Sequence, residues 1–418
     1  MAKKLTFIDL FAGAGGLSEG FIRAGYEPIA HVEMDEAACY TLKTRVAYHY
    51  LKEHKQIEKY KQYLRGEINR DILYADIPQV LLDSVINLPI GGESNPKIHK
   101  RIESLLGNRK VDLIIGGPPC QAYSLVGRAR SKDGMKSDSR NYLYIQYARY
   151  LERYQPKMFV FENVLGLKSA GGGVYLENMR NLFLEKGYSM KYFKVEANDF
   201  GVLQNRKRII ILGWRTVLNI QPPELGDIKT KKNHKVGELL HDLPSIQAGE
   251  GKDRFLKYTT RKPNKYLYEA GIRNGLDILT QHVARPHTEQ DKEIYKIAVE
   301  MLGTGERLNY TKLPEKLKTH KNQHSFFDRF KVVDANASHS QTVVAHISKD
   351  GHYYIHPDIN QNRSLTVREA ARLQSFPDDF YFEGMKEGKN RTAAFKQIGN
   401  AVPPLMAKEI AFLINQIL

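Results

Sequence analysis

The sequence predicts an α/β protein in which a doubly wound, mostly parallel sheet carries helices on both faces and is joined to a smaller second domain. Three observations support this fold class. Residues 1–35 follow the pattern strand, glycine-rich turn, helix, strand that opens such sheets. Apolar runs that end in glycine or an acid recur at residues 111–116 and 158–162. After Arg215 this alternation stops, and regular amphipathic helix returns only near residue 367.

Runs of apolar residues and the turns between them define the expected elements of the first domain. Strands are expected at residues 6–11, 28–33, 111–116, 158–162, 188–195 and 208–214. The last two of these are expected to pair near an edge of the sheet. Helices are expected through residue 24, within the polar stretch 48–64, and at 174–186. Residues 42–110 are interpreted as a basic insertion before the next clear strand, with no role assigned.

The pattern divides the chain into four expected segments. They are a cofactor-binding domain at 1–218, a second domain of loops and short strands at 219–366, a hinge at 367–396 and a returning segment at 397–418. Amphipathic helices are expected at 367–376 and 404–418 within the last two.

Composition excludes several classes of protein. The chain has 418 residues, with 63 Lys and Arg against 47 Asp and Glu, for a net charge of +16. A polyanionic partner is indicated, with nucleic acid ahead of the alternative of a merely solvated basic surface. Cys39 and Cys120 are too few for a disulfide framework or a four-cysteine zinc site. No apolar run approaches the length of a membrane span and no signal peptide is evident, so we expect a cytoplasmic protein.

The turn at residues 11–16 favours a nucleoside-containing cofactor. Its glycines let a ligand approach the backbone, and the following helix presents free N–H groups. Glu33 ends the next strand, where an acid can accept hydrogen bonds from a ribose. Ser18 stands where a dinucleotide fingerprint has its third glycine, so NAD is the weaker candidate.

Cys120 follows Pro118 and Pro119 at the end of a buried strand, the edge at which open α/β sheets bind ligands. The basic loop beyond it contains Arg128 and Arg130 and is expected to close over a phosphate backbone. Nearby cations lower the pKa of a thiol and favour the nucleophilic thiolate. Cys39 is expected only to pack.

Glu162 ends another apolar strand at the same edge. It is either a structural partner or an acid–base group. Arg208 begins the strand at 208–214 and is expected to orient Glu162 or a substrate, although such basic runs are ordinarily solvated turns.

These residues resemble one family closely, the cytosine-C5 DNA methyltransferases. The resemblance rests on ordered motifs across residues 7–404: FIDLFAGAGG at 7–16, EMD at 33–35, PPCQ at 118–121, ENV at 162–164, QNRKR at 204–208, REAARLQ at 368–374 with FP at 376–377, and QIGNAVPP at 397–404.

The resemblance implies a class I S-adenosylmethionine-dependent methyltransferase fold with a target-recognition domain at 219–366. The residues that it implies for S-adenosylmethionine are Phe11, Gly13, Ala14, Gly15, Gly16, Leu17, Glu33, Met34, Pro119, Asn400 and Val402. The family also places an acid near the adenine amino group, for which we favour Asp71 over Asp76.

The catalytic residues implied by the resemblance are Cys120, Glu162, Arg206 and Arg208. Thiolate attack at C6 of cytosine would activate C5 for methylation, with Glu162 and Arg208 holding the ring. The target base would have to flip out of the duplex.

The expected DNA contacts come from Ser124, Arg128, Arg130 and Thr342, although Thr342 is equally expected as a plain strand residue. The partners implied are double-stranded DNA and a restriction endonuclease, for a monomeric prokaryotic enzyme.

Other functions remain open from the residues alone. A transfer-RNA methyltransferase of the same family carries a Cys-Phe-Thr element, but no cysteine follows Cys120 here. A silent DNA-binding subunit would not need Cys120, Glu162 and Arg208 together. The histidines across residues 234–356 lack the short paired spacing of zinc ligands, so we expect polar surface and no metal.

Overall fold

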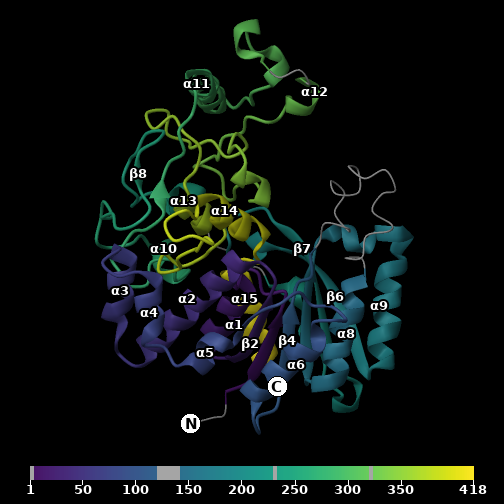
Figure 1. Cartoon of the computed structure of the whole chain (residues 1–418). Helices are drawn as coiled ribbons and strands as arrows, with labels where there is room; N and C mark the ends of the chain where they lie inside the picture. Colours follow the sequence, from purple (N-terminus) through teal and green to yellow (C-terminus); the bar gives the residue numbers. More distant parts are fainter. Residues whose placement is uncertain (1–3, 120–141, 229–232, 320–322) are drawn as a thin grey trace.

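The computed structural model describes residues 4–119, 142–228, 233–319 and 323–418 (Figure 1). Seven strands form one sheet in the order β3-β2-β1-β4-β5-β7-β6. Their bounds are β1 (Thr6–Leu10), β2 (Glu27–Glu33), β3 (Val85–Asn87), β4 (Leu113–Gly116), β5 (Met158–Asn163), β6 (Tyr188–Glu196) and β7 (Lys207–Arg215). In this sheet β7 runs antiparallel to both neighbours, and the other pairs are parallel. The predicted fold class is confirmed, and so is the pairing of the last two strands at an edge.

Strand β3 lies inside the stretch 42–110, so the interpretation of that whole stretch as an insertion is wrong. It pairs in parallel with β2, with Asn87 opposite Glu33. Three residues are too few to show a period of two, and the sequence pattern therefore misses this strand.

Helices cover both faces of the sheet (Figure 1). On one face lie α1 (Gly16–Arg23), α2 (Glu36–Glu53) and α15 (Pro404–Asn415). On the other lie α6 (Asn95–Leu106), α8 (Leu143–Tyr154) and α9 (Val174–Glu185). Right-handed crossovers account for this arrangement, because the strand order reverses direction after β3 and the following helices therefore cover the opposite face. Helices α1 and α15 pack closely, because a Cβ at Gly20 would come within 2.3 Å of the Ala407 Cβ.

Three short helices follow α2: α3 (Ile57–Arg65), α4 (Arg70–Ala75) and α5 (Gln79–Asp83). They share a small apolar core with α2 that also includes Tyr381. The Thr44 hydroxyl donates to Glu383 at 2.8 Å, and Tyr63 donates to the same carboxylate. This helical part of the stretch 42–110 therefore braces the segment around residues 379–383.

The region 219–366 is mostly irregular, as expected, within the part that the structure describes. Its regular elements are α10 (Lys265–Glu269), α11 (Glu289–Gly303), α12 (Gln323–Phe326) and the strand pair β8 (Gly251–Lys252) and β9 (His282–Val283). Helix α11 was not expected. It packs on an apolar cluster that is separate from the main core. Together with α12 it forms the outer lobe in Figure 1.

Single-turn 3-10 helices fill many of the connections. They are η2 (Leu165–Lys168), η3 (Ala170–Gly173), η4 (Ala197–Phe200), η5 (Thr216–Leu218), η6 (Leu225–Asp227), η7 (Val236–Leu239), η8 (Tyr310–Lys312), η9 (Glu315–Leu317) and η10 (Ala345–Ser348).

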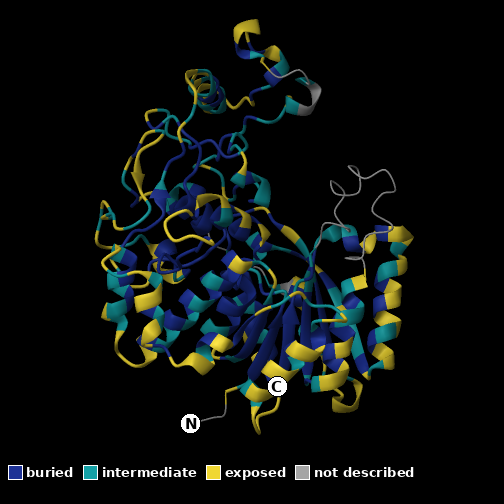
Figure 2. Cartoon of the chain, in the orientation of Figure 1, coloured by how far each residue is buried: buried dark blue, intermediate teal, exposed yellow. Residues whose placement is uncertain are grey.

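The chain returns to the sheet through α13 (Val367–Leu373), α14 (Arg391–Asn400) and α15. Residues 363–384 are buried without interruption (Figure 2). Their charges are paired, as in the ion pair of 2.5 Å between Arg372 and Asp378. The stretch expected as a hinge thus begins as a buried segment against which both parts of the protein pack. Among the described helices, none has the length and apolar character needed to cross a bilayer.

Candidate active site

The turn after β1 needs backbone conformations that favour glycine. Gly13 and Gly15 have φ values of 55° and 81°, and Phe11 also has a positive φ of 60°. A Cβ at Gly13 would meet no atom within 4 Å, so this position is open on its outer side. A Cβ at Gly16 would come within 2.3 Å of the Val402 carbonyl oxygen. The left-handed backbone conformation therefore explains why glycine occupies positions 13 and 15, whereas close packing explains the glycine at position 16.

The Glu33 carboxylate organises this turn. It accepts hydrogen bonds from the backbone N–H of Gly13 at 2.8 Å, of Met34 at 2.8 Å and of Asp35 at 2.7 Å. Burial raises the pKa of Glu33, and the three amide hydrogen bonds oppose that rise. Met34 is 65% exposed beside it, an unusual exposure for an apolar side chain.

Asn87, rather than Asp71, is the residue that the sheet brings beside Glu33. Its Nδ2 donates to the carbonyl oxygens of Glu33 at 3.1 Å and Met34 at 3.0 Å. Those two contacts fix the orientation of the amide and direct Oδ1, an acceptor, away from them.

The expectation that Asp71 lies near the adenine is corrected by β3, because that strand brings Asn87 beside Glu33 instead. Asp71 lies in the first turn of α4, which packs on α2 and α3 rather than at the ends of the strands. Asp76 ends α4 and forms an ion pair with Lys59.

When the registers among β2, β1, β4 and β5 are extended by one residue, four residues fall in one row at the carboxyl ends of these parallel strands. In sheet order they are Glu33, Phe11, Gly117 and Glu162. At about 4.8 Å between strands, Glu33 and Glu162 stand about 14 Å apart. The carboxyl ends of these strands thus carry the glycine-rich turn and Glu33 on one side and Glu162 on the other.

Glu162 and Arg208 form an ion pair, as expected, with 2.7 Å between Oε1 and Nε. Both side chains are mostly buried but reachable, at 12% and 13% exposed. Arg208 also donates from Nη1 to the Lys207 carbonyl at 2.7 Å, which restrains the guanidinium. A Cβ at Gly117 would come within 2.8 Å of Glu162 Oε2, so this glycine makes room for the carboxylate.

The turn that leads to Cys120 is held by Asn163. Its Nδ2 donates to the Pro118 carbonyl at 3.3 Å, and its Oδ1 accepts from the Val164 N–H at 2.9 Å. Pro119 is partly buried at the end of this turn. Cys120 lies outside the described residues, as do the predicted DNA-contacting residues Ser124, Arg128 and Arg130.

Arg206 has a different environment from the predicted catalytic one. Its side chain is completely buried, and its guanidinium donates to three backbone carbonyls: Val343 at 2.9 Å, Ala401 at 2.8 Å and Gly399 at 3.3 Å. A group enclosed in this way cannot touch a substrate. The prediction of a catalytic Arg206 is therefore wrong, and the residue instead holds two distant chain segments together.

Gln204 and Gln374 complete the same buried node. Gln204 accepts from the Val343 N–H at 3.0 Å, and Gln374 donates to the Ile398 carbonyl at 2.7 Å. The node fixes the segment around Val343 against the segment that carries Asn400 and Val402.

The remaining predicted cofactor residues differ in exposure. Asn400 is exposed at the end of α14, whereas Val402 is 8% exposed and meets Gly16 through its carbonyl. Ala14 and Leu17 are buried at 2% and 5% exposure. Their side chains pack into the core, which leaves only their backbone for a ligand.

Thr342 lies next to the start of β7. Its hydroxyl donates to the Asn205 carbonyl, and its own carbonyl accepts from Tyr354 at 2.7 Å. The expectation of surface histidines is wrong for His282 and His356, which are buried; His282 lies between Thr366 and the Pro244 carbonyl.

The strand order with an antiparallel β7, together with the glycine-rich turn and its acid, defines the class I S-adenosylmethionine-dependent methyltransferase fold. A model of the C-5 cytosine-specific DNA methylase family matches residues 5–78 and 89–416. The chain therefore belongs to the C-5 cytosine-specific DNA methylase family, and it is a DNA cytosine-5 methyltransferase.

Individual relatives agree with this assignment. The chain is 43% identical to the Type II methyltransferase M.Bpa9945I of Bacillus paralicheniformis, over 99% of both chains. It is 31% identical to M1.HphI of Haemophilus parahaemolyticus, over 97% of this chain and 86% of the relative. A crystal structure of an Escherichia coli prophage protein, proposed to be a DNA modification methyltransferase, superposes with a TM-score of 0.64 at 25% identity, over 99% of both chains.

Proposed function

We propose that this enzyme transfers a methyl group from S-adenosylmethionine to C5 of a cytosine that it flips out of a specific duplex sequence, through a covalent adduct with Cys120. The observation that carries the proposal is the row at the sheet edge. It presents a cofactor-type turn at Glu33 and an arginine-paired carboxylate, Glu162, about 14 Å away, on strands about 4.8 Å apart. Cys120 follows the turn between them in the chain.

The described residues fit S-adenosylmethionine. The open side of Gly13 admits a ligand next to the backbone, and Glu33 can accept ribose hydroxyls beyond its three amide contacts. The exposed Met34 offers an apolar surface to the adenine, and Asn87 Oδ1 offers an acceptor to its amino group. When bound, the cofactor supplies a methyl group activated by the positive charge of its sulfonium.

The chain's own residues then carry the chemistry. The Cys120 thiolate attacks C6 of cytosine, and the C5–C6 electron pair becomes available at C5. Glu162 donates a hydrogen bond to N3, or accepts one from the amino group, and so stabilises the charge that develops on the ring. Arg208 holds the Glu162 carboxylate at 2.7 Å and is directed at the O2 of the ring. After C5 has taken the methyl group it loses its proton to solvent. The electron pair of the C5–H bond reforms the C5–C6 double bond as the C6–S bond breaks and Cys120 leaves as the thiolate.

We infer that the DNA is read by residues 219–366, because the rest of the chain is committed to the methyltransferase core. Thr342 lies where this region meets the start of β7, and it is proposed to contact a phosphate near the target. Ser124, Arg128 and Arg130 are proposed to contact the DNA backbone as well. The names of the relatives, Type II methyltransferases, support a restriction-modification setting. A cognate endonuclease and a monomeric enzyme are part of the proposal.

The test is to express the protein in a host that lacks DNA methylation and to map 5-methylcytosine in plasmid DNA by conversion-based sequencing. Methylation confined to one short sequence is expected for the wild type and absent for Cys120→Ser. Cys39→Ser is the matched control, because it alters the other cysteine of the chain and is expected to methylate normally. Methylation by Cys120→Ser would contradict the nucleophile assignment. Absent methylation by a folded wild type would favour an RNA substrate.

A further inference from the structure

A second cavity, separate from the row that carries Glu33 and Glu162, lies between α1 and α2. It has a volume of about 660 Å³, within the range of small-molecule sites. Strand β2 forms its floor, and apolar side chains such as Ile29, Leu42 and Val46 form much of its wall. The inner side of the cofactor turn, at Ala14 and Gly15, forms part of the same wall.

His31 lines the cavity from β2 and has no hydrogen-bond partner among the described residues. It is 2% exposed, and its Nδ1 is buried with no hydrogen bond. Buried polar atoms in folded proteins are nearly always satisfied, so an imidazole that lines a cavity and makes no hydrogen bond is available to a bound molecule. Burial lowers the pKa of His31 to about 4, so the ring is neutral and offers one donor and one acceptor.

The charges around the cavity are unbalanced in favour of cations. Glu19 is bound by Arg45 at 2.7 Å, and Glu27 by Arg109 at 2.6 Å. These two lining carboxylates are thereby neutralised by lining arginines, whereas Glu53, a third lining carboxylate, is exposed and forms no ion pair with the described residues.

Three further lining cations, Lys4, Arg23 and Lys52, have no carboxylate partner among the described residues. Arg23 donates from Nη2 to the Ala270 carbonyl, while its Nη1 is buried without a hydrogen bond. Lys52, on the exposed rim, donates only to the Tyr48 hydroxyl. Positive groups that are not neutralised attract an anion.

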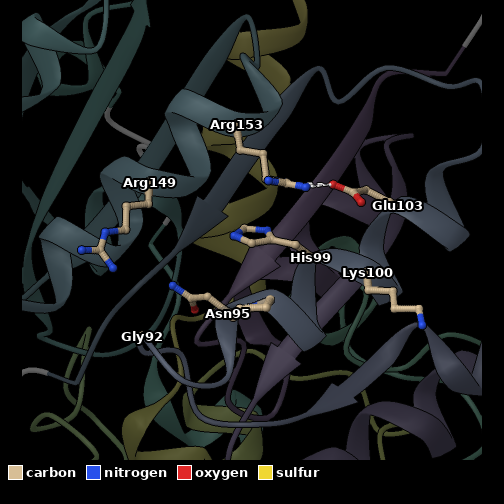
Figure 3. Close-up of a pocket in the computed structure, with 8 residues that line it drawn as sticks. Gly92, Asn95, His99, Lys100, Glu103, Arg149 and Arg153 are labelled. Carbon is tan, nitrogen blue, oxygen red and sulfur yellow. Dashed lines mark hydrogen bonds and ion pairs between the residues drawn. The ribbon is translucent and has the colours of Figure 1, made fainter.

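A smaller pocket between α6 and α8 provides a contrast (Figure 3). It has a volume of about 360 Å³, and its polar side chains other than Lys100 bind one another or their neighbours. His99 contacts the Tyr154 hydroxyl at 2.8 Å, Asn95 donates to Gln146 at 2.9 Å, and Glu103 pairs with Arg153. Satisfied groups of this kind give a ligand little to bind.

We propose that the cavity between α1 and α2 is a second small-molecule site, which takes an organic anion with an apolar body. The apolar wall accommodates the body, His31 hydrogen-bonds it at the floor, and Arg23 and Lys52 attract the anionic group. Because α1 begins at the cofactor turn, an occupant alters the affinity for S-adenosylmethionine. That last step rests on the proposed cofactor, whereas the site itself does not.

The test uses 8-anilinonaphthalene-1-sulfonate, an apolar body with a sulfonate, titrated into the full-length protein without cofactor and followed by fluorescence. We expect one saturable site. His31→Phe, which fills the floor and removes the imidazole, is expected to weaken binding about tenfold. His99→Phe, in the smaller pocket, is the matched control and is expected to bind like the wild type. Equal binding by both variants would overturn the proposal.

A second variant keeps the test decisive if His31→Phe fails to fold. Lys52 is exposed, so Lys52→Glu is expected to fold and to weaken binding of the sulfonate about threefold or more, by charge alone. Binding of neutral 2-naphthol should not change. No effect on the sulfonate, or an equal effect on both probes, would contradict an anion site.

Coupling is measured separately, as S-adenosylmethionine affinity with and without saturating sulfonate. A change of about threefold or more is expected, and by linkage it must be reciprocal. An unchanged affinity would overturn the coupling. Absent cofactor binding in both titrations would instead contradict the proposed function.

Discussion

Arg206→Met tests whether this arginine positions the active site or takes part in the reaction. The substitution removes the only charge from a completely buried node and leaves the carbonyls of Val343, Gly399 and Ala401 without their guanidinium donor. Each buried carbonyl deprived of a donor costs about 1–3 kcal/mol, and the apolar methionine recovers part of this through packing. A net loss of about 3 kcal/mol in the free energy of unfolding is therefore expected.

The assay is urea denaturation, followed by tryptophan fluorescence and circular dichroism, with calorimetric measurement of S-adenosylmethionine affinity on the folded variant. Lys207→Met is the control on the neighbouring residue of β7. Lys207 is exposed and pairs only at the surface with Glu196, so its loss is expected to cost less than about 0.5 kcal/mol. The node also holds the segment of Val402, and cofactor affinity should fall with stability. An unfolding midpoint equal to that of the control, with the loss confined to kcat, would refute the positioning role.

Three further predictions concern the sheet edge. Burial raises the pKa of Asp9 to about 7, so the folded state favours the protonated carboxyl. The contribution of Asp9 to the free energy of unfolding is therefore fully present below its unfolded pKa near 4, and it is lost as pH rises through 7. Asp9→Asn should remove this loss, and its urea midpoint relative to wild type should rise between pH 5 and pH 8 by the equivalent of about 2–3 kcal/mol; an identical pH slope in both proteins would contradict this. Gly117→Ala would bring a Cβ within 2.8 Å of Glu162 Oε2 and is expected to lower kcat about 100-fold with an unchanged fold, as checked by single-turnover methylation; a wild-type rate would argue against a positioned carboxylate. Asn87→Ala should weaken S-adenosylmethionine binding about tenfold in calorimetry, because it removes the amide that holds the Glu33 and Met34 carbonyls, and unchanged affinity would exclude Asn87 from the cofactor site.

Local sequence patterns were enough to predict many of the site residues at the carboxyl ends of the parallel strands. Glycines with positive φ, such as Gly13, and an acid that ends an apolar strand, such as Glu162, are visible because turn and strand chemistry depends on neighbours in the chain. The pair of Arg208 with Glu162 was also expected. Asn163 belongs to the ENV motif at 162–164, but its contact with the Pro118 carbonyl could not be inferred from the spacing of residues.

Several assignments failed because they depend on contacts between distant segments. Asn87 ends a three-residue strand, and only its pairing with β2 brings it to Glu33. Arg206 and Arg208 look alike in the chain, and two residues apart on a strand they would share a face. Arg206, however, lies just before β7 begins, and its side chain enters a buried node, whereas Arg208 pairs with Glu162. The helices after α2 were assigned no role, although they brace the segment at residues 379–383 from more than 300 residues away in sequence.

The sequence by itself determined the doubly wound sheet, the glycine-rich turn, the acids at strand ends and the resemblance to the cytosine-C5 DNA methyltransferases. Each of these depends on short-range periodicity or on an ordered motif. The tertiary structure decided which side chains meet: Asn87 with Glu33, Arg206 with the carbonyls of Gly399 and Ala401, and the unpartnered His31 with its cavity. The physical reason is that strand register and the burial of polar groups are properties of the packed chain, in which hydrogen-bond partners come from segments far apart in sequence.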